Sequence, residues 1–128
     1  MYVQGFVLPV PAERKAEYRD FAQKTAAVMK EYGLIENVQA WEQDVPDGEH
    51  TDFRKAVKLQ DNEKVVFTWL TWPDKVTCDS AHQQMTSDPR TKEFREQMPF
   101  DGTRMIAGGF DPIVQFGEFA NQTPMEGA

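Results

Sequence analysis

The sequence predicts an α+β fold in which strands and helices follow one another in the order β-α-β-β-α-β. One long stretch between Pro11 and Gly33 has apolar residues every three or four positions, which is typical of a helix. Another stretch, Lys64–Trp72, is rich in β-branched and aromatic residues, which is typical of a strand. This order is the ferredoxin-like plan, an antiparallel sheet with both helices on one face.

The first predicted strand runs from Tyr2 to Val10 and ends at Pro9-Val10-Pro11, because proline cannot donate to a β-ladder. Pro11 suits the first turn of a helix, and that helix is predicted to continue to about Tyr32. Its apolar stripe consists of Tyr18, Phe21, Ala22, Thr25, Val28, Met29 and Tyr32. Gly33 followed by Leu34 predicts the end of the helix.

A second, less regular strand is predicted over Ile35–Val45, followed by a turn at Pro46-Asp47-Gly48. The stretch Phe53–Leu59 is compatible with a short strand or with a helical turn. Lys64–Trp72 follows as the clearest strand of the chain.

Pro73 opens a second helix that is predicted to reach Met85, and Asp88 with Pro89 begins a short further helix. The last strand region is predicted over Arg104–Phe116, interrupted by Gly108-Gly109, which indicates a bulge or a close backbone contact. Residues 1–117 are therefore expected to form one domain, and the polar tail 118–128 is expected to be disordered.

The chain has 128 residues and a net charge of −7, which disfavours partners with negatively charged surfaces. Nucleic acids and anionic membranes attract lysine and arginine, so neither is expected as a partner. The only cysteine, Cys78, cannot form an intramolecular disulfide. No signal peptide and no apolar run of roughly 20 residues is visible, so the chain is expected in the cytoplasm.

Both faces of the predicted strands are apolar, and this predicts a homodimer. In the strand Lys64–Trp72, Val65, Phe67 and Trp69 oppose the set Val66, Leu70 and Trp72. Two helices cover only one face of a sheet, and the other face would expose more apolar area than a soluble monomer usually does. A second copy, packed sheet to sheet with two-fold symmetry, would cover that face and remove about 800 Å² per subunit from water.

Several motifs resemble the bacterial family known as domain of unknown function 1428. They are Gly5-Phe6-Val7-Leu8-Pro9-Val10-Pro11, Asp44-Val45-Pro46 with Gly48 and Thr51, then Phe53, Ala56 and Val57, then Asp88-Pro89-Arg90, and the run from Met98 to Phe110. The resemblance covers nearly the whole chain except its tail. It implies a dimeric α/β barrel, but no established activity and no catalytic residues. Proteins of that architecture include cofactor-independent monooxygenases, haem-degrading enzymes and small-molecule-binding modules, an analogy of fold alone.

His82 is the first candidate for chemistry, because a histidine in the groove between helices and sheet would act as a general base or a ligand donor. The alternative is a partly buried histidine bonded to the backbone. Cys78 lies one helical turn away, but it is better explained as a small buried apolar residue than as a nucleophile.

Asp101 and Arg104 are a candidate charge pair at the mouth of a cleft, where the arginine would suit a carboxylate ligand. The structural alternative is that Asp101 shapes a turn and Arg104 pairs across an interface. Trp41 and Trp69 are candidate surfaces for a flat apolar ligand, and core packing explains them equally well.

No metal site and no cofactor motif is predicted. His50 lies among carboxylates in the segment 44–52, but their spacing matches no calcium loop, and a solvated acidic loop explains them better. Gly108-Gly109 lacks the lysine and the helix of a phosphate-binding loop.

Two functions remain open. The first is a homodimer that binds or converts a small apolar or aromatic molecule in a cleft between helices and sheet, with His82, Trp69, Arg104, Asp101 and Trp41 as ligand-binding candidates. The alternative is a non-catalytic dimeric module that binds a protein partner, which predicts a cleft filled by side chains.

Overall fold

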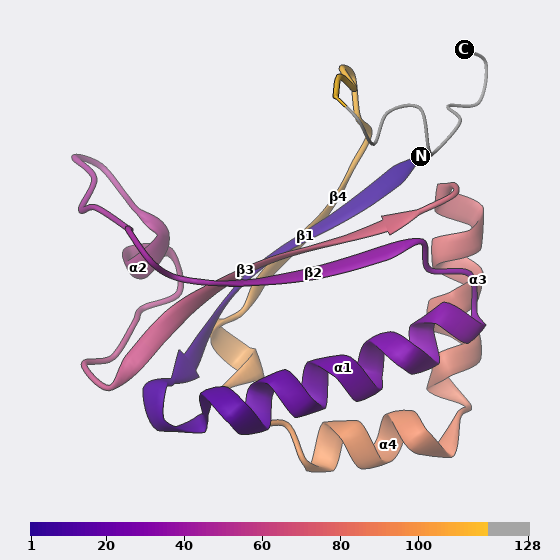
Figure 1. Cartoon of the computed structure of the whole chain (residues 1–128), viewed down its shortest axis with the longest axis horizontal. Helices are drawn as coiled ribbons and strands as arrows, with labels where there is room; N and C mark the ends of the chain where they lie inside the picture. The colour runs from indigo at the N-terminus through magenta and orange to yellow at the C-terminus, as the bar shows by residue number, and fades with distance from the viewer. Residues whose placement is uncertain (118–128) are drawn as a thin grey trace.

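The computed structural model describes residues 1–117 and contains one four-stranded antiparallel sheet (Figure 1). The sheet order is β2-β3-β1-β4. The strands are β1 (Tyr2–Pro11), β2 (Glu36–Trp41), β3 (Glu63–Trp72) and β4 (Ile106–Phe110). The predicted ferredoxin-like α+β fold is confirmed. The predicted disorder of 118–128 concerns residues outside those that the structure describes.

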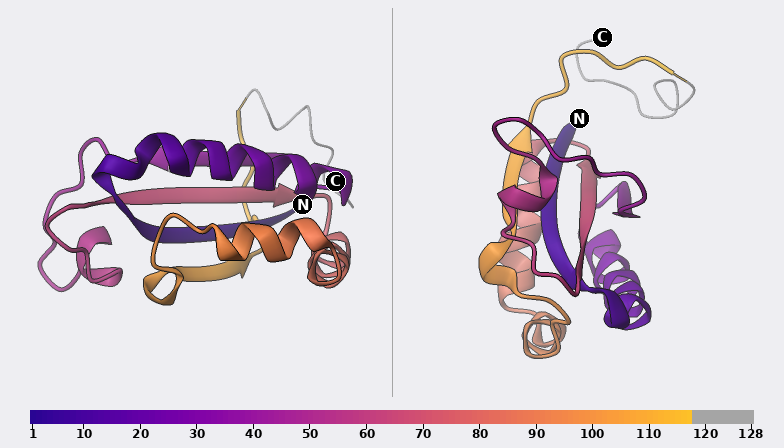
Figure 2. Two further views of the ribbon diagram at one scale, coloured as in Figure 1. Left: turned by 90° about the horizontal axis from the view of Figure 1, so that it is seen from below. Right: turned by 90° about the vertical axis from the view of Figure 1, so that its left-hand side faces the viewer.

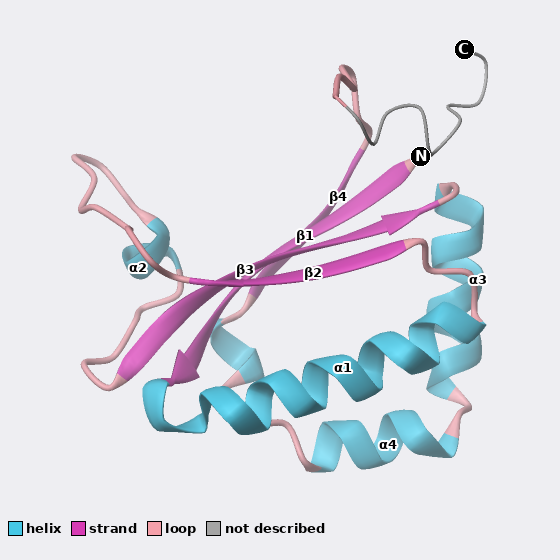
Figure 3. Cartoon of the chain, in the orientation of Figure 1, coloured by secondary structure: helices cyan, strands magenta, loops and turns pink. Residues whose placement is uncertain are grey.

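Helices α1 (Lys15–Glu31), α3 (Lys75–Thr86) and α4 (Pro89–Glu96) lie together on one side of the sheet (Figures 2 and 3). The ambiguous segment Phe53–Leu59 contains a short helix, α2 (Phe53–Ala56), near the end of the sheet that lies farthest from α3 (Figure 1), where the ring of Phe53 contacts that of Phe67 on β3. Two 3₁₀ turns, η1 (Ala12–Arg14) and η2 (Gly102–Arg104), precede α1 and β4. Among the described residues, no helix is long and apolar enough to cross a membrane.

Aspartates begin three of the helices. The carboxylates of Asp52, Asp74 and Asp88 accept hydrogen bonds from the backbone amides of Lys55, Thr77 and Arg90, which satisfies donors that have no partner within the helix.

Gly33 ends α1 as predicted. Its φ of +108° favours glycine, and the amide of Leu34 donates to the carbonyl of Met29 at 3.2 Å, closing a Schellman-type turn.

Strand β1 ends at Pro11, so the predicted end of the strand at Pro9-Val10-Pro11 is confirmed to within one residue, although Pro9 and Pro11 themselves are still paired with β3. The amide of Ala12 donates to the carbonyl of Asn62, on the side of β3. Because amides alternate in direction along a strand, the nitrogens of Pro9 and Pro11 face the opposite side. Strand β4 pairs with β1 only over Val3–Val7, so no neighbouring strand needs a donor at the prolines.

Strands β2 and β4 are shorter than predicted. Beyond Trp41 the amide of Glu42 still donates to the carbonyl of Val65 at 2.9 Å, but the amide of Val65 donates to the Glu42 carboxylate at 2.8 Å, so a side chain replaces one of the two backbone bonds of the next pair. Strand β4 ends at Phe110 and begins only after η2. The predicted close contact is present at Gly109, because a Cβ there would lie 1.6 Å from the hydroxyl of Tyr2. The register of β1 and β4 runs through both glycines without a bulge.

The helix-facing side of the sheet carries the core. Leu8, Val10, Val66, Leu70 and Trp72 are buried there against α1 and α3.

The other side, which we call the open face, consists of Val3, Gly5 and Val7 of β1, Phe67 and Trp69 of β3, and Ile106, Gly108 and Phe110 of β4. At one end of it, Val57 and Leu59, which follow α2, pack on Val7 and Val65. The remainder forms an apolar hollow of about 390 Å³.

Candidate ligand-binding cleft

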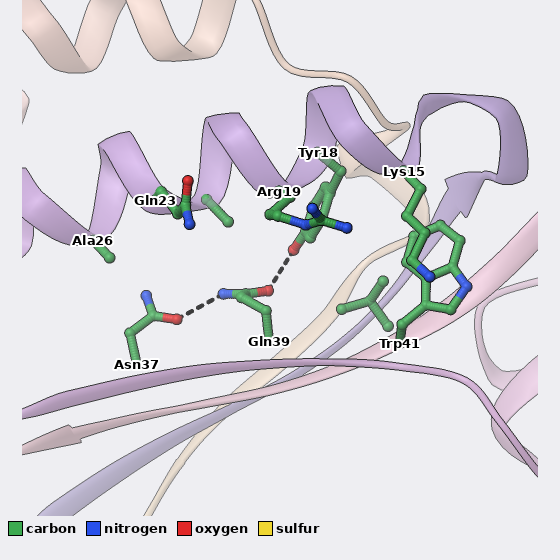
Figure 4. Close-up of a pocket in the computed structure, with 10 residues that line it drawn as sticks. Lys15, Tyr18, Arg19, Gln23, Ala26, Asn37, Gln39 and Trp41 are labelled. Atoms are coloured by element: carbon green, nitrogen blue, oxygen red, sulfur yellow. Dashed lines mark hydrogen bonds between the residues drawn. The ribbon is translucent and has the colours of Figure 1, made fainter.

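A cleft of about 340 Å³ lies between α1 and the outer strand β2 (Figure 4). Lys15, Tyr18, Arg19, Ala22, Gln23 and Ala26 of α1, Asn37, Gln39 and Trp41 of β2, and Val66 of β3 line it. Its volume is within the range of small-molecule sites, and both walls are regular elements that fix the geometry.

The periodicities of the two elements create the cleft. On β2, Asn37, Gln39 and Trp41 are two residues apart, so all three side chains point toward the helix. On α1, Tyr18, Ala22 and Ala26 recur every four residues on the facing side. The two alanines leave space that larger side chains would fill.

A chain of hydrogen bonds runs along the cleft wall. The hydroxyl of Tyr18 donates to Oε1 of Gln39 at 2.6 Å, and Nε2 of Gln39 donates to Oδ1 of Asn37 at 2.8 Å (Figure 4). This order leaves Nδ2 of Asn37 as the terminal donor, and within residues 1–117 it has no protein acceptor. Burial raises the pKa of the Tyr18 hydroxyl well above its usual value, so the phenol stays protonated at neutral pH.

Positive charge lies at the mouth of the cleft. Lys15 and Arg19 are one helical turn apart on α1, and neither forms an ion pair with any described residue. The ammonium of Lys15 lies 5.2 Å from the centre of the Trp41 ring, a cation–π contact. In a chain of net charge −7, this mouth is a local concentration of positive charge.

A smaller apolar hollow of about 130 Å³ continues the cleft into the core. The two cavities share Tyr18, Ala22, Asn37 and Gln39. The inner one is lined mainly by apolar side chains, among them Phe6, Leu8, Met29, Leu70 and Phe100. The line of hydrogen bonds therefore separates a charged outer part from an apolar inner part.

Of the five predicted site residues, the structure places only Trp41 in this cleft. Trp69 lies on the open face, where its indole nitrogen donates to Glu36 at 3.1 Å. His82 is exposed on α3, where it contacts the side chain of Gln4 at 3.0 Å and the ring of Trp72 at 5.9 Å between centres. Gln4 in turn accepts from the buried indole of Trp72, and none of these three residues lines the cleft.

Asp101 and Arg104 lie together on η2, but they face a buried carboxylate and not a cavity. The guanidinium of Arg104 binds both oxygens of Glu63, at 2.7 and 2.6 Å, and also Asp101 at 2.9 Å. Asp101 also accepts from the backbone amide of Thr103, as expected of a residue that shapes a turn. Hydrogen bonds from Arg104 hold the pKa of Glu63 below its usual value.

The described residues contain no group of three or more His, Cys, Asp or Glu side chains arranged to hold a metal. In the acidic loop Asp52 caps α2 and also accepts from the amide of Gly48 at 3.1 Å. Cys78 is buried against the sheet, and burial raises the pKa of its thiol.

Sequence reasoning missed Tyr18, Gln39, Asn37, Lys15 and Arg19. The available signal was on the second strand. Its two amide side chains, Asn37 and Gln39, lie on the same face as Trp41, and Val38 and Ala40 lie on the other face. A strand face that is polar while it faces a helix indicates a cavity or a hydrogen-bonded network.

Relatives of this chain occur in enteric bacteria. The uncharacterized protein YbaA of Escherichia coli (strain K12) is 56% identical over 113 residues, which cover 88% of this chain and 97% of the relative. The uncharacterized protein YbaA of Shigella flexneri gives the same identity and coverage.

Solved structures with low sequence identity share the fold. A dimeric ferredoxin-like protein from an uncultured marine organism aligns with a TM-score of 0.61 at 9% identity, covering 92% of this chain and all of that one. A cofactor-independent oxygenase, SnoaB from Streptomyces nogalater, aligns with a TM-score of 0.56 at 16% identity, covering 91% and 98% of the two chains.

A family model described as a protein of unknown function, DUF1428, matches residues 1–102, which include both walls of the cleft and most of the sheet. Together with the relatives at 56% identity, this match identifies the family that the motifs resembled. The chain belongs to the DUF1428 family.

Proposed function

We propose that this protein is a homodimer whose subunits each bind a small aromatic anion in the cleft between α1 and β2. The observation that carries the proposal is the combination, in one cavity of about 340 Å³, of an aromatic wall, two cations without ion-pair partners in the described chain, and a terminal amide donor. Each group matches a different part of such a ligand.

The position of each group suggests how the ligand would lie. A flat ring would pack on Trp41 and Val66, with Ala22 and Ala26 opposite. A carboxylate or a similar anion on the ring would face Arg19 and Lys15 at the mouth. An acceptor atom deeper in the cleft would take the hydrogen bond from Nδ2 of Asn37.

The chemistry of the lining favours binding over covalent catalysis. Tyr18 is protonated at neutral pH and its hydroxyl already donates to Gln39, so it would not act as a base. Within residues 1–117, no cysteine, serine or histidine lines the cleft. The alternative function, a module that binds a protein partner on its outer surface, predicts a cleft filled by side chains and is not favoured by a cavity of this size.

The proposed homodimer rests on the open face. Phe67, Ile106 and Phe110 are 42%, 46% and 61% exposed there, and a solved protein of the same fold is described as dimeric. Packing two such faces together would bury an apolar surface that a monomer leaves in water.

A cavity-filling variant tests the binding site. We expect 2-naphthoate to bind the wild-type protein and Ala26→Leu to weaken binding at least about tenfold, because the added side chain occupies the cleft. Arg19→Gln should weaken binding about fivefold, as expected for loss of an exposed charge worth about 1 kcal/mol. Isothermal titration calorimetry measures both effects.

Ala27→Leu is the matched control, since Ala27 is exposed on the same helix and does not line the cleft. It should bind like the wild type. The uncharged 2-naphthamide should bind more weakly than 2-naphthoate and should not respond to Arg19→Gln. Equal affinity of Ala26→Leu and Ala27→Leu for 2-naphthoate would mean that the ligand lies elsewhere, and the proposal would fail.

A further inference from the structure

The segment that follows β4 exposes its apolar side chains. Ile113, Val114 and Phe116 are 94%, 80% and 99% exposed. Isolated apolar residues are ordinary on protein surfaces, but three almost fully exposed large ones within four positions form a patch. We call Asp111–Phe116 the arm.

Gln115, between the exposed Val114 and Phe116, points the other way. The side-chain oxygen of Gln115 is buried and has no hydrogen-bond partner within residues 1–117. A buried polar atom without a partner is unfavourable, and so is an exposed phenyl ring. The arm therefore has the inverse of the pattern that would suit a segment packed on its own subunit.

The position of the arm keeps it from covering its own open face. It continues directly from β4 and extends past the end of the sheet (Figure 2). It joins the open face through Phe110, which is 61% exposed on that face. The apolar surface of the open face and that of the arm are thus continuous along the chain.

We propose that the arm packs against the partner subunit in the homodimer, so that each subunit extends its sheet-to-sheet contact with a segment that crosses to the other copy. This inference rests on the homodimer of the proposed function. A second copy is the occupant that fits, because it brings another apolar open face to the point where the arm begins.

The dimer dissociation constant tests the arm. Burying one side chain of this size strengthens association roughly tenfold to a hundredfold, so Ile113→Asn combined with Phe116→Ser should weaken the dimer at least about thirtyfold in sedimentation equilibrium. Val76→Asn is the matched control, because Val76 is 77% exposed on α3, on the opposite side of the sheet. It should leave the dissociation constant unchanged.

The outcomes separate the arm from the dimer itself. Phe67→Asp places a charge in the middle of the open face and should produce monomers. If it does so while the double arm variant dissociates like the wild type, the homodimer stands and the arm proposal is overturned. A wild-type protein that is monomeric at micromolar concentration would overturn both.

Thiol labelling shows which subunit the arm contacts. In a Cys78→Ala background, a cysteine introduced by Phe116→Cys should react slowly with 5,5′-dithiobis(2-nitrobenzoate) in the dimer and at least about tenfold faster once Phe67→Asp is added. Protection that persists in the monomeric variant would place the arm on its own subunit and overturn the proposal.

Discussion

At the scale of single residues, the side chains that line the cleft have roles that depend on the residues they contact in the folded structure. Tyr18 is part of the apolar stripe expected from the sequence, and only the facing strand shows that its hydroxyl binds Gln39. Trp41 was predicted as a ligand surface on its aromatic character and does line the cleft. His82 and Arg104 were chosen for their chemistry, but their partners lie far apart in sequence, 78 residues away for Gln4 and 41 for Glu63. No local pattern contains such contacts.

The stability of the protein is predicted to depend on pH through Tyr18. Because its pKa is raised in the folded state, its contribution to stability is complete below the unfolded pKa of about 10 and is lost as the pH rises above it. At pH 7 the wild type should exceed Tyr18→Phe in unfolding free energy by about 1 kcal/mol, the usual value of one hydrogen bond. Urea unfolding should show this advantage shrinking between about pH 10 and 11. An advantage that stays constant over that range would contradict the prediction.

At the scale of elements, the sequence predicted the order of the elements and the start of α4, because an aspartate cap, proline and glycine act locally. Helices α1 and α3 begin at Lys15 and Lys75, a few residues after the predicted Pro11 and Pro73. Gly33, Asp88 and Pro89 stand where their chemistry placed them. The strand ends were predicted less well, since a strand ends where its neighbour ends. Strand β1 continues through Pro9 because β4 has already stopped, and β2 stops because the Glu42 carboxylate takes over its next bond.

Gly33, at the C-terminal end of α1, lies close to α3. A Cβ at Gly33 would be strained at φ +108° and would lie 2.7 Å from Cγ2 of Thr77 on α3. Gly33→Ala should therefore lower the unfolding free energy by about 1–3 kcal/mol. Adding Thr77→Ser removes the contacting methyl group and should restore part of that loss in urea unfolding. If Thr77→Ser restores nothing, the contact with α3 contributes nothing and backbone strain explains the whole effect.

At the scale of the whole molecule, two apolar faces on one sheet were visible in the sequence, and the structure shows that helices cover only one of them. The cleft was predicted to lie between helices and sheet, but its position next to β2 could not be predicted. That place depends on the packing distance between α1 and the sheet, which small residues such as Ala22 and Ala26 determine only once the two elements face each other.

The apolar open face leads to a prediction about the formation of the homodimer. Phe67→Asp should shift the protein to monomers at micromolar concentration, because a carboxylate would have to be buried between two apolar sheets. Its monomer should keep a wild-type circular dichroism spectrum, since Phe67 is 42% exposed in the isolated chain. Val76→Asp on α3 is the control and should not change sedimentation. A dimeric Phe67→Asp protein would mean that the open face is not the interface.

The prolines of β1 also bear on how the chain behaves at high concentration. Where β4 ends, the flank of β1 presents Pro9 and Pro11, and neither has an N–H group to offer an incoming strand. A foreign strand would find carbonyls there without the alternating donors that a growing ladder needs. That part of the sheet margin is therefore expected to resist recruitment into fibrils, which agrees with the proposed association of two copies through their open faces and not through this edge.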